Sequence, residues 1–98
     1  GHIFYGFIQI DKDGTYEFQT TSDDGSVLIV NGFPIVDNDG LHSRKTISGD
    51  IPLKAGFHKI EVQYFERGGQ ESLDVKWRGP GFEWATIPAF RLFRTDDH

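Results

Sequence analysis

The sequence contains no cysteine and no methionine, so neither a disulfide nor thiol chemistry is available to it. Because position 1 is not methionine, we expect the chain to be a piece of a longer protein. Its first residues show neither the charged n-region nor the apolar h-region of a signal peptide. No apolar run approaches the roughly 18 residues of a membrane-spanning helix, so we expect no membrane insertion.

Positive charge is also scarce. The chain has 10 lysine and arginine residues against 15 aspartate and glutamate residues, which gives a net charge of -5. Proteins that hold nucleic acid by its phosphate backbone need a basic surface. The charge balance therefore argues against a nucleic acid partner.

Helix-forming residues are few, whereas β-branched and aromatic residues are common. Alanine occurs only three times, and 12 glycines are spread along the chain. This composition favours β-strands separated by tight turns. A length of 98 residues corresponds to one domain. We therefore expect an all-β fold in a single domain that spans residues 1–98.

Apolar and polar residues alternate along several segments, as they do in half-buried strands. Strands are expected at residues 3–10, 15–20, 27–30, 33–36, 43–53, 58–66, 71–78 and 90–93. The residues expected to face inward are Tyr16, Phe18, Leu28, Val30, Ile60, Val62, Tyr64, Leu73, Val75 and Trp77. Many short strands at this spacing predict an antiparallel β-sandwich or barrel.

Turn signals separate these strands. Asn31-Gly32 is the strongest of them and predicts a type I′ hairpin, with positive φ at both residues. Polar turns are also expected at residues 22–26 and 37–40. Pro88 argues against a central strand within residues 82–93, because proline cannot donate to the ladder.

Asp23 and Asp24 are the first candidate site. Adjacent carboxylates in an extended chain normally point to opposite faces and repel each other if brought together. A cation would reverse that balance, and oxygen ligands of this kind suit Ca²⁺. The alternative is a solvated turn in which the aspartates accept hydrogen bonds from backbone N–H groups.

Other polar clusters carry weaker signals. Residues 37–40 resemble the start of an EF-hand loop, but the glycine and the final glutamate that such a loop needs are missing. His42 and His58 have no partner at metal-ligand spacing, and the chain has no Gly-x-Ser-x-Gly motif. We therefore expect that the domain is not an enzyme.

Trp84, together with Phe82, falls outside the alternating pattern. An exposed tryptophan can stack on a sugar ring, whose C–H face is apolar. Packing in the core or at the sandwich edge is the alternative for this residue.

Several runs, in order along the chain, resemble the PA14 domain family. They cover most of residues 6–93, and none is decisive alone. The runs are residues 14–18, the Thr-Ser-Asp-Asp-Gly-Ser of 21–26, residues 30–32 and 36–42, the Leu-Lys-Ala-Gly-Phe-His-Lys-Ile of 53–60, and the Gly-Pro-Gly of 79–81.

The resemblance implies an antiparallel PA14-like β-sandwich of the kind found in adhesins, glycosidases and toxins outside the cell or on its surface. In glycan-binding members, two adjacent aspartates joined by a cis peptide chelate Ca²⁺, and the ion binds vicinal sugar hydroxyls. Asp23 and Asp24 match that pair.

The family's remaining ligands come from a second loop, which here corresponds to residues 66–71. The asparagine of the yeast adhesins is absent from it, and the loop offers Glu66, Gln70 and Glu71 as metal ligands. Gly69 and Gln70, with Trp84, are the further residues expected to contact a saccharide. The chain is also shorter than is usual for the family.

Two functions follow from these observations. The first is a Ca²⁺-dependent carbohydrate-binding module of a secreted or cell-surface protein, joined to other domains of that protein. The second is a structural or protein-docking module of a larger extracellular enzyme, without a ligand of its own. A bound ion or a cis peptide at Asp23-Asp24 would separate the two.

Overall fold

The computed structural model describes residues 2–22, 25–38, 45–65, 73–87 and 93–96. This part of the chain consists of β-strands and turns, with no helix that could span a membrane. The strands are β1 (His2–Ile10), β2 (Gly14–Ser22), β3 (Gly25–Val30), β4 (Phe33–Asn38), β5 (Lys45–Leu53), β6 (Gly56–Phe65), β7 (Leu73–Gly79), β8 (Phe82–Thr86) and β9 (Phe93–Asp96).

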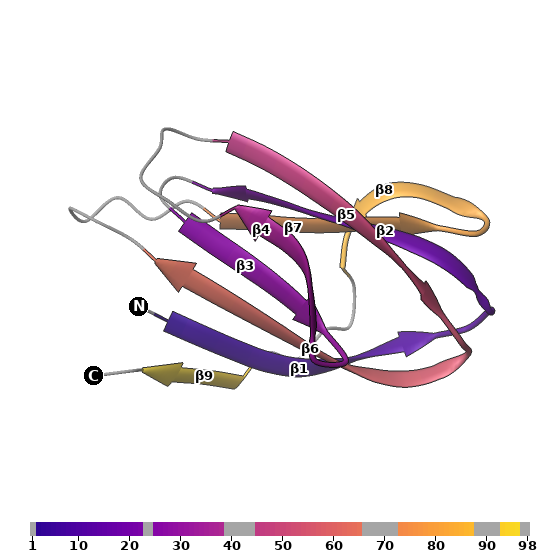
Figure 1. The fold of residues 1–98 in the computed structure, drawn as a ribbon. Coiled ribbons are helices and arrows are strands. Elements are labelled where there is room, and N and C mark those ends of the chain that lie inside the picture. Colours follow the sequence, from indigo (N-terminus) through magenta and orange to yellow (C-terminus); the bar gives the residue numbers. More distant parts are fainter. Residues whose placement is uncertain (1, 23–24, 39–44, 66–72, 88–92, 97–98) are drawn as a thin grey trace.

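The strands form two antiparallel sheets that pack face to face (Figure 1). One sheet has the order β4-β3-β6-β1-β9, and the other has the order β5-β2-β7-β8. Below we call them sheet A and sheet B. The antiparallel sandwich predicted from the alternating pattern is therefore confirmed.

The core lies between the two sheets and is built from the inward side chains of both. Of the ten residues predicted to face inward, eight are buried, from Phe18 on sheet B to Leu28 on sheet A. Val75 is only partly buried, but it packs against the core. The side chain of Leu73 lies outside the described residues. Period-two alternation was thus a sound guide to the core.

Asn31 and Gly32 form the predicted hairpin turn between β3 and β4. Their φ angles are 53° and 83°, the left-handed values that a type I′ turn requires. The backbone N–H of Asn31 also donates to the carbonyl of Lys59, at 2.9 Å. This bond ties the turn to the neighbouring strand β6.

Strand boundaries near the polar turns differ from the sequence prediction. Residues 22–26 were predicted as a turn, yet Ser22 ends β2 and Gly25 begins β3. Asn38, predicted in a polar loop, closes β4 and is 2% exposed. For Ser22 and Asn38, a buried hydrogen-bond network, described below, gives the polar side chain partners within the sandwich.

The end of the chain also differs. Residues 82–86 form strand β8, which among the described strands pairs with β7 and ends before Pro88, so proline does not interrupt it. The closing strand was predicted at residues 90–93, but β9 spans Phe93–Asp96 beside β1. Residues 90–92 lie outside the described residues.

Candidate functional site

Strand ends from both sheets converge at one end of the sandwich, which we call the loop end (Figure 1). On sheet A, Gly25 of β3 lies directly opposite Phe65 of β6. On sheet B, Ser22 of β2 lies directly opposite Leu73 of β7. The residues that flank positions 23–24 are therefore paired with the residues that flank positions 66–72.

The proposed ligands themselves are not among the described residues. Asp23, Asp24, Glu66, Gly69, Gln70 and Glu71 all lie outside them, as does the peptide bond between the two aspartates. Within the described part of the chain, no group of three or more histidine, aspartate or glutamate side chains could hold a metal ion. The sequence prediction of a metal site therefore stays a prediction.

A buried polar network underlies the loop end. Ser26 donates from its hydroxyl to Thr20 Oγ1 at 3.0 Å, and the hydroxyls of Ser22 and Ser26 are 2.9 Å apart. Asn38 Nδ2 reaches Thr20 Oγ1 at 3.5 Å and Ser22 Oγ at 3.4 Å. These four residues are 0–2% exposed.

This network connects β2, β3 and β4, and so joins the two sheets by hydrogen bonds where the core would otherwise be apolar. Unpaired polar groups are costly at such depth, whereas a connected set of them fixes a single arrangement. The residues on either side of positions 23–24, Ser22 and Gly25, are buried in this layer. Sequence reasoning missed the network, although extending the alternation of Phe18 and Thr20 by two residues would have placed Ser22 on the inward face.

His58, considered above as an isolated histidine, lies on β6 beside a turn, and it belongs to no metal-binding group among the described residues. Its Nε2 is 2.6 Å from the carbonyl oxygen of Lys54, and its Nδ1 is 2.8 Å from Asn31 Nδ2. The Lys54 carbonyl can only accept, so Nε2 donates to it, and Nδ1 accepts from the Asn31 amide. The ring thereby links the β5–β6 turn to the β3–β4 hairpin.

Trp84 lies on β8, the edge strand of sheet B, and is partly buried. The guanidinium of Arg78 stands over its ring, 4.9 Å from the ring centroid, and Arg78 also forms an ion pair with Glu17. Arg78 is five residues along β7 from Leu73, a separation of about 17 Å in an extended strand. Trp84 is therefore placed apart from the loop end.

Comparison with known proteins shows which family shares this arrangement. The model of the PA14 domain family matches residues 2–88. The anti-sigma-I factor RsgI3 of Acetivibrio thermocellus is 30% identical over 83 residues, which cover 84% of this chain and 13% of that protein. The chain thus spans about an eighth of the length of this curated relative.

Solved structures agree with the family match. An anti-sigma factor domain-containing protein superimposes with a TM-score of 0.82 at 26% identity, covering 89% of this chain and 31% of the other. A PA14 sugar-binding domain from an RTX adhesin superimposes with a TM-score of 0.73 at 26% identity, covering 94% of this chain and 49% of the other. With its sandwich topology and a family match over almost its whole length, the chain belongs to the PA14 domain family.

Proposed function

We propose that this PA14 domain is a non-catalytic carbohydrate-binding module that holds a saccharide through Ca²⁺ at Asp23 and Asp24. Further oxygen ligands would come from Glu66, Gln70 and Glu71, and Gly69 would contact the sugar beside them. Such a module would act outside the cell or on its surface, as one domain of a larger protein. The sugar-binding PA14 domain of the RTX adhesin supports the ligand class.

The observation that carries the proposal is the strand pairing at the loop end. Ser22 opposes Leu73 and Gly25 opposes Phe65, so the attachment points of both proposed ligand segments are neighbours. Directly opposed residues of antiparallel strands have Cα atoms about 5 Å apart. The buried network of Thr20, Ser22, Ser26 and Asn38 would give these segments a rigid base.

The donor chemistry is consistent with calcium. Carboxylate and amide oxygens are the hard ligands that Ca²⁺ takes in sets of six to eight. A vicinal diol of a sugar would supply two more oxygens in place of water. Few contacts would surround one monosaccharide, so we expect weak affinity at a single site.

The proposal is tested by glycan-array binding with calcium and with EGTA, together with calorimetry of calcium uptake. Asp23→Asn and Asp24→Asn should each abolish calcium uptake and calcium-dependent glycan binding while leaving the circular dichroism spectrum unchanged. Asp50→Asn is the matched control, because Asp50 is an exposed carboxylate on β5, away from the loop end. Absence of calcium uptake by the unmodified domain at millimolar ion would refute the proposal.

The second candidate is a structural or protein-docking module without a ligand of its own. The comparison that favours it is length, because the chain corresponds to 13% of RsgI3 and to about a third of an anti-sigma factor structure. Domains that occupy such a small share of a protein can serve to space or dock others. This function would be preferred if neither calcium nor any glycan on the array were bound.

A further inference from the structure

A groove with a volume of about 380 Å³ opens at the end of the sandwich opposite the loop end. Gly14, at this end of β2, is eight residues from Ser22, or about 26 Å along an extended strand. The volume lies within the range of small-ligand sites. The groove is lined by Phe7, Ile8, Gln9, Asp11, Lys12, Tyr16, Phe57, Trp77, Pro80 and Phe82.

The floor of the groove is a cluster of aromatic rings between the sheets. The rings of Tyr16 and Trp77 are stacked at a centroid distance of 5.7 Å, and Phe82 lies 4.9 Å from Trp77. The Tyr16 hydroxyl donates to the carbonyl of Lys12 at 2.7 Å, which fixes the β1–β2 turn over this floor. The groove is thus built by tertiary contacts and is formed before any ligand arrives.

Glycine makes this close packing possible on the β7 side. A methyl group added at Gly79 would overlap the ring of Tyr16. One added at Gly14 would press on the ring of Pro80, so the β1–β2 and β7–β8 turns touch there. Because these turns and rings are already packed against each other, the site loses little conformational entropy when a ligand binds.

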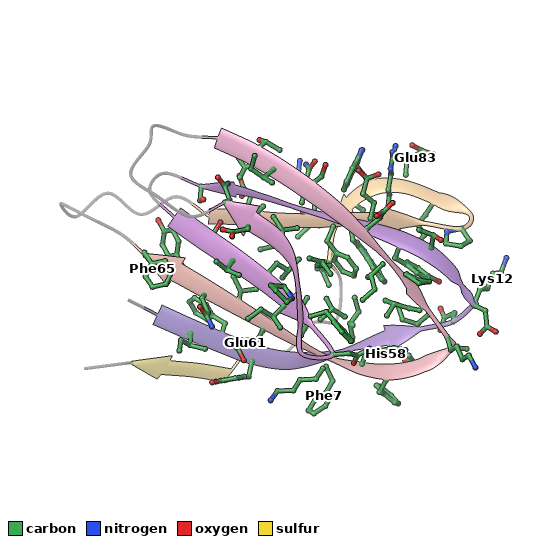
Figure 2. All side chains as sticks on the ribbon, viewed as in Figure 1. Phe7, Lys12, His58, Glu61, Phe65 and Glu83 are labelled. Carbon is green, nitrogen blue, oxygen red and sulfur yellow. The ribbon has the colours of Figure 1, made fainter. Side chains whose placement is uncertain are left out.

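The rim carries two aromatic side chains that are largely in water. Phe7 is 61% exposed and Phe57 is 72% exposed, and Figure 2 shows Phe7 pointing away from the sandwich. Gln9 lies directly opposite Phe57, and Phe7 lies opposite Lys59, so the two rings are diagonal neighbours on the outer face of sheet A. The groove is also lined by inward residues such as Trp77. It therefore extends from the outer face of sheet A, past the edge of β1, to the space between the sheets.

The side chains that line the groove indicate which class of ligand it can bind. Aromatic faces favour a ligand with flat C–H surfaces, and Gln9, Asp11 and Lys12 favour one with hydroxyl groups. Asp11 and Lys12 carry opposite charges, so neither an anion nor a cation is favoured. A purely apolar ligand would remove these three polar side chains from water without hydrogen bonds.

We propose that this groove is a second saccharide site, independent of calcium, that takes a neutral chain of β-1,4-linked pyranose units. In such chains the hydroxyls of glucose or xylose rings are equatorial, which leaves both faces of each ring as C–H surfaces for Phe7 and Phe57. The proposal does not depend on the calcium site, because the two ends of the sandwich share no described residue.

The test is titration of the 98-residue chain with cellohexaose and with xylohexaose in excess EGTA. Trp77 lines the groove and Trp84 does not, so a Trp84→Phe variant leaves Trp77 as the only tryptophan and reports binding by its fluorescence. Phe7→Ala and Phe57→Ala should each lower the association constant about three- to tenfold, as loss of one aromatic contact would. Phe33→Ala is the matched control, since Phe33 is 65% exposed but does not line the groove.

The possible outcomes separate the two sites. Binding that persists in EGTA and in Asp23→Asn, but weakens in Phe57→Ala, supports the second site even if calcium uptake fails. Binding that EGTA abolishes, or no binding of either hexasaccharide, overturns it. A concentration-dependent dimer in sedimentation that Phe57→Ala dissociates would also overturn it, by assigning the exposed rings to contact between copies.

Discussion

Buried hydroxyl and amide groups hold the loop end of the sandwich, and Thr20 is at their centre. Its Oγ1 accepts from Ser26 and from Asn38, so two buried donors share this one oxygen. A network of this kind is sensitive to the loss of a single member, because each neighbouring buried group loses one of its hydrogen bonds. The loop end should therefore respond more strongly to isosteric substitution than the surface does.

We predict that Thr20→Val lowers the free energy of unfolding by about 1–3 kcal/mol. Valine keeps the shape of threonine but removes the acceptor. Thr21→Val is the matched control on the same strand, since the Thr21 hydroxyl bonds Thr46 at 2.7 Å in an exposed position. It should change stability by less than about 0.5 kcal/mol. Urea denaturation measures the free energy of unfolding of both variants. An equal decrease in the two would contradict the central role of Thr20.

This network also marks how far the sequence could predict the site. The alternation of Tyr16 and Phe18, continued by two residues, places Thr20 on the inward face, but alternation gives no register between strands and so could not reveal Ser26 and Asn38 as its partners. Asn38 stands in an Asp-Asn-Asp-Gly run that is typical of a turn. Only the pairing of Ser26 with Asn38 across β3 and β4 accounts for its burial.

At the scale of elements, β4 and β5 bring the two sheets together along one side of the sandwich. Gly49 of β5 lies opposite Phe18, on the inward face, and approaches the carbonyl of Ile35 in β4. A side chain at Gly49 would meet that backbone oxygen, which cannot rotate away as a flexible side chain could. Glycine inside a strand often marks such a close approach.

Gly49→Ala should therefore destabilise the domain by about 1–3 kcal/mol, near the upper end of that range because the contacted atom belongs to the backbone. The comparison variant is Ser48→Ala, one residue away on the exposed face of the same strand. Thermal unfolding followed by circular dichroism gives the difference. Equal melting temperatures for the two variants would mean that the close contact between β4 and β5 does not restrict the residue at position 49.

Element prediction succeeded where alternation was strong and failed at the edges. The segments of β2, β6 and β7 alternate cleanly, and their positions agree with the prediction to within two residues. Strand β8 was missed for two reasons. The sequence around Phe82 and Trp84 does not show which of the two faces inward, and Pro88 made residues 82–93 resemble a loop. Its place is set by pairing with β7 and by the packing of Phe82 on Trp77, both long-range contacts.

At the scale of the whole molecule, the sandwich separates two ends of different chemistry. The loop end contains a buried network of hydroxyl groups, whereas the opposite end presents an aromatic groove. The core between them, from Phe18 to Ile60, contains no aspartate, glutamate, lysine, arginine or histidine among its described residues. Ligands at the two ends should therefore bind without strong electrostatic coupling, and their effects on stability should add.

Calcium should raise the melting temperature of the domain if Asp23 and Asp24 hold it. An ion that binds only the folded state at about ten times its dissociation constant stabilises that state by about 1.4 kcal/mol. For a domain of this size, each kcal/mol corresponds to a shift of about 4–8 °C, so we expect a rise of roughly 6–11 °C. Scanning calorimetry in calcium and in EGTA measures it. Asp23→Asn should abolish the rise and Phe57→Ala should retain it, because Phe57 lies at the opposite end. A melting temperature that is the same in both buffers would mean that the folded domain holds no calcium, and the aromatic groove would then be the remaining candidate for saccharide binding.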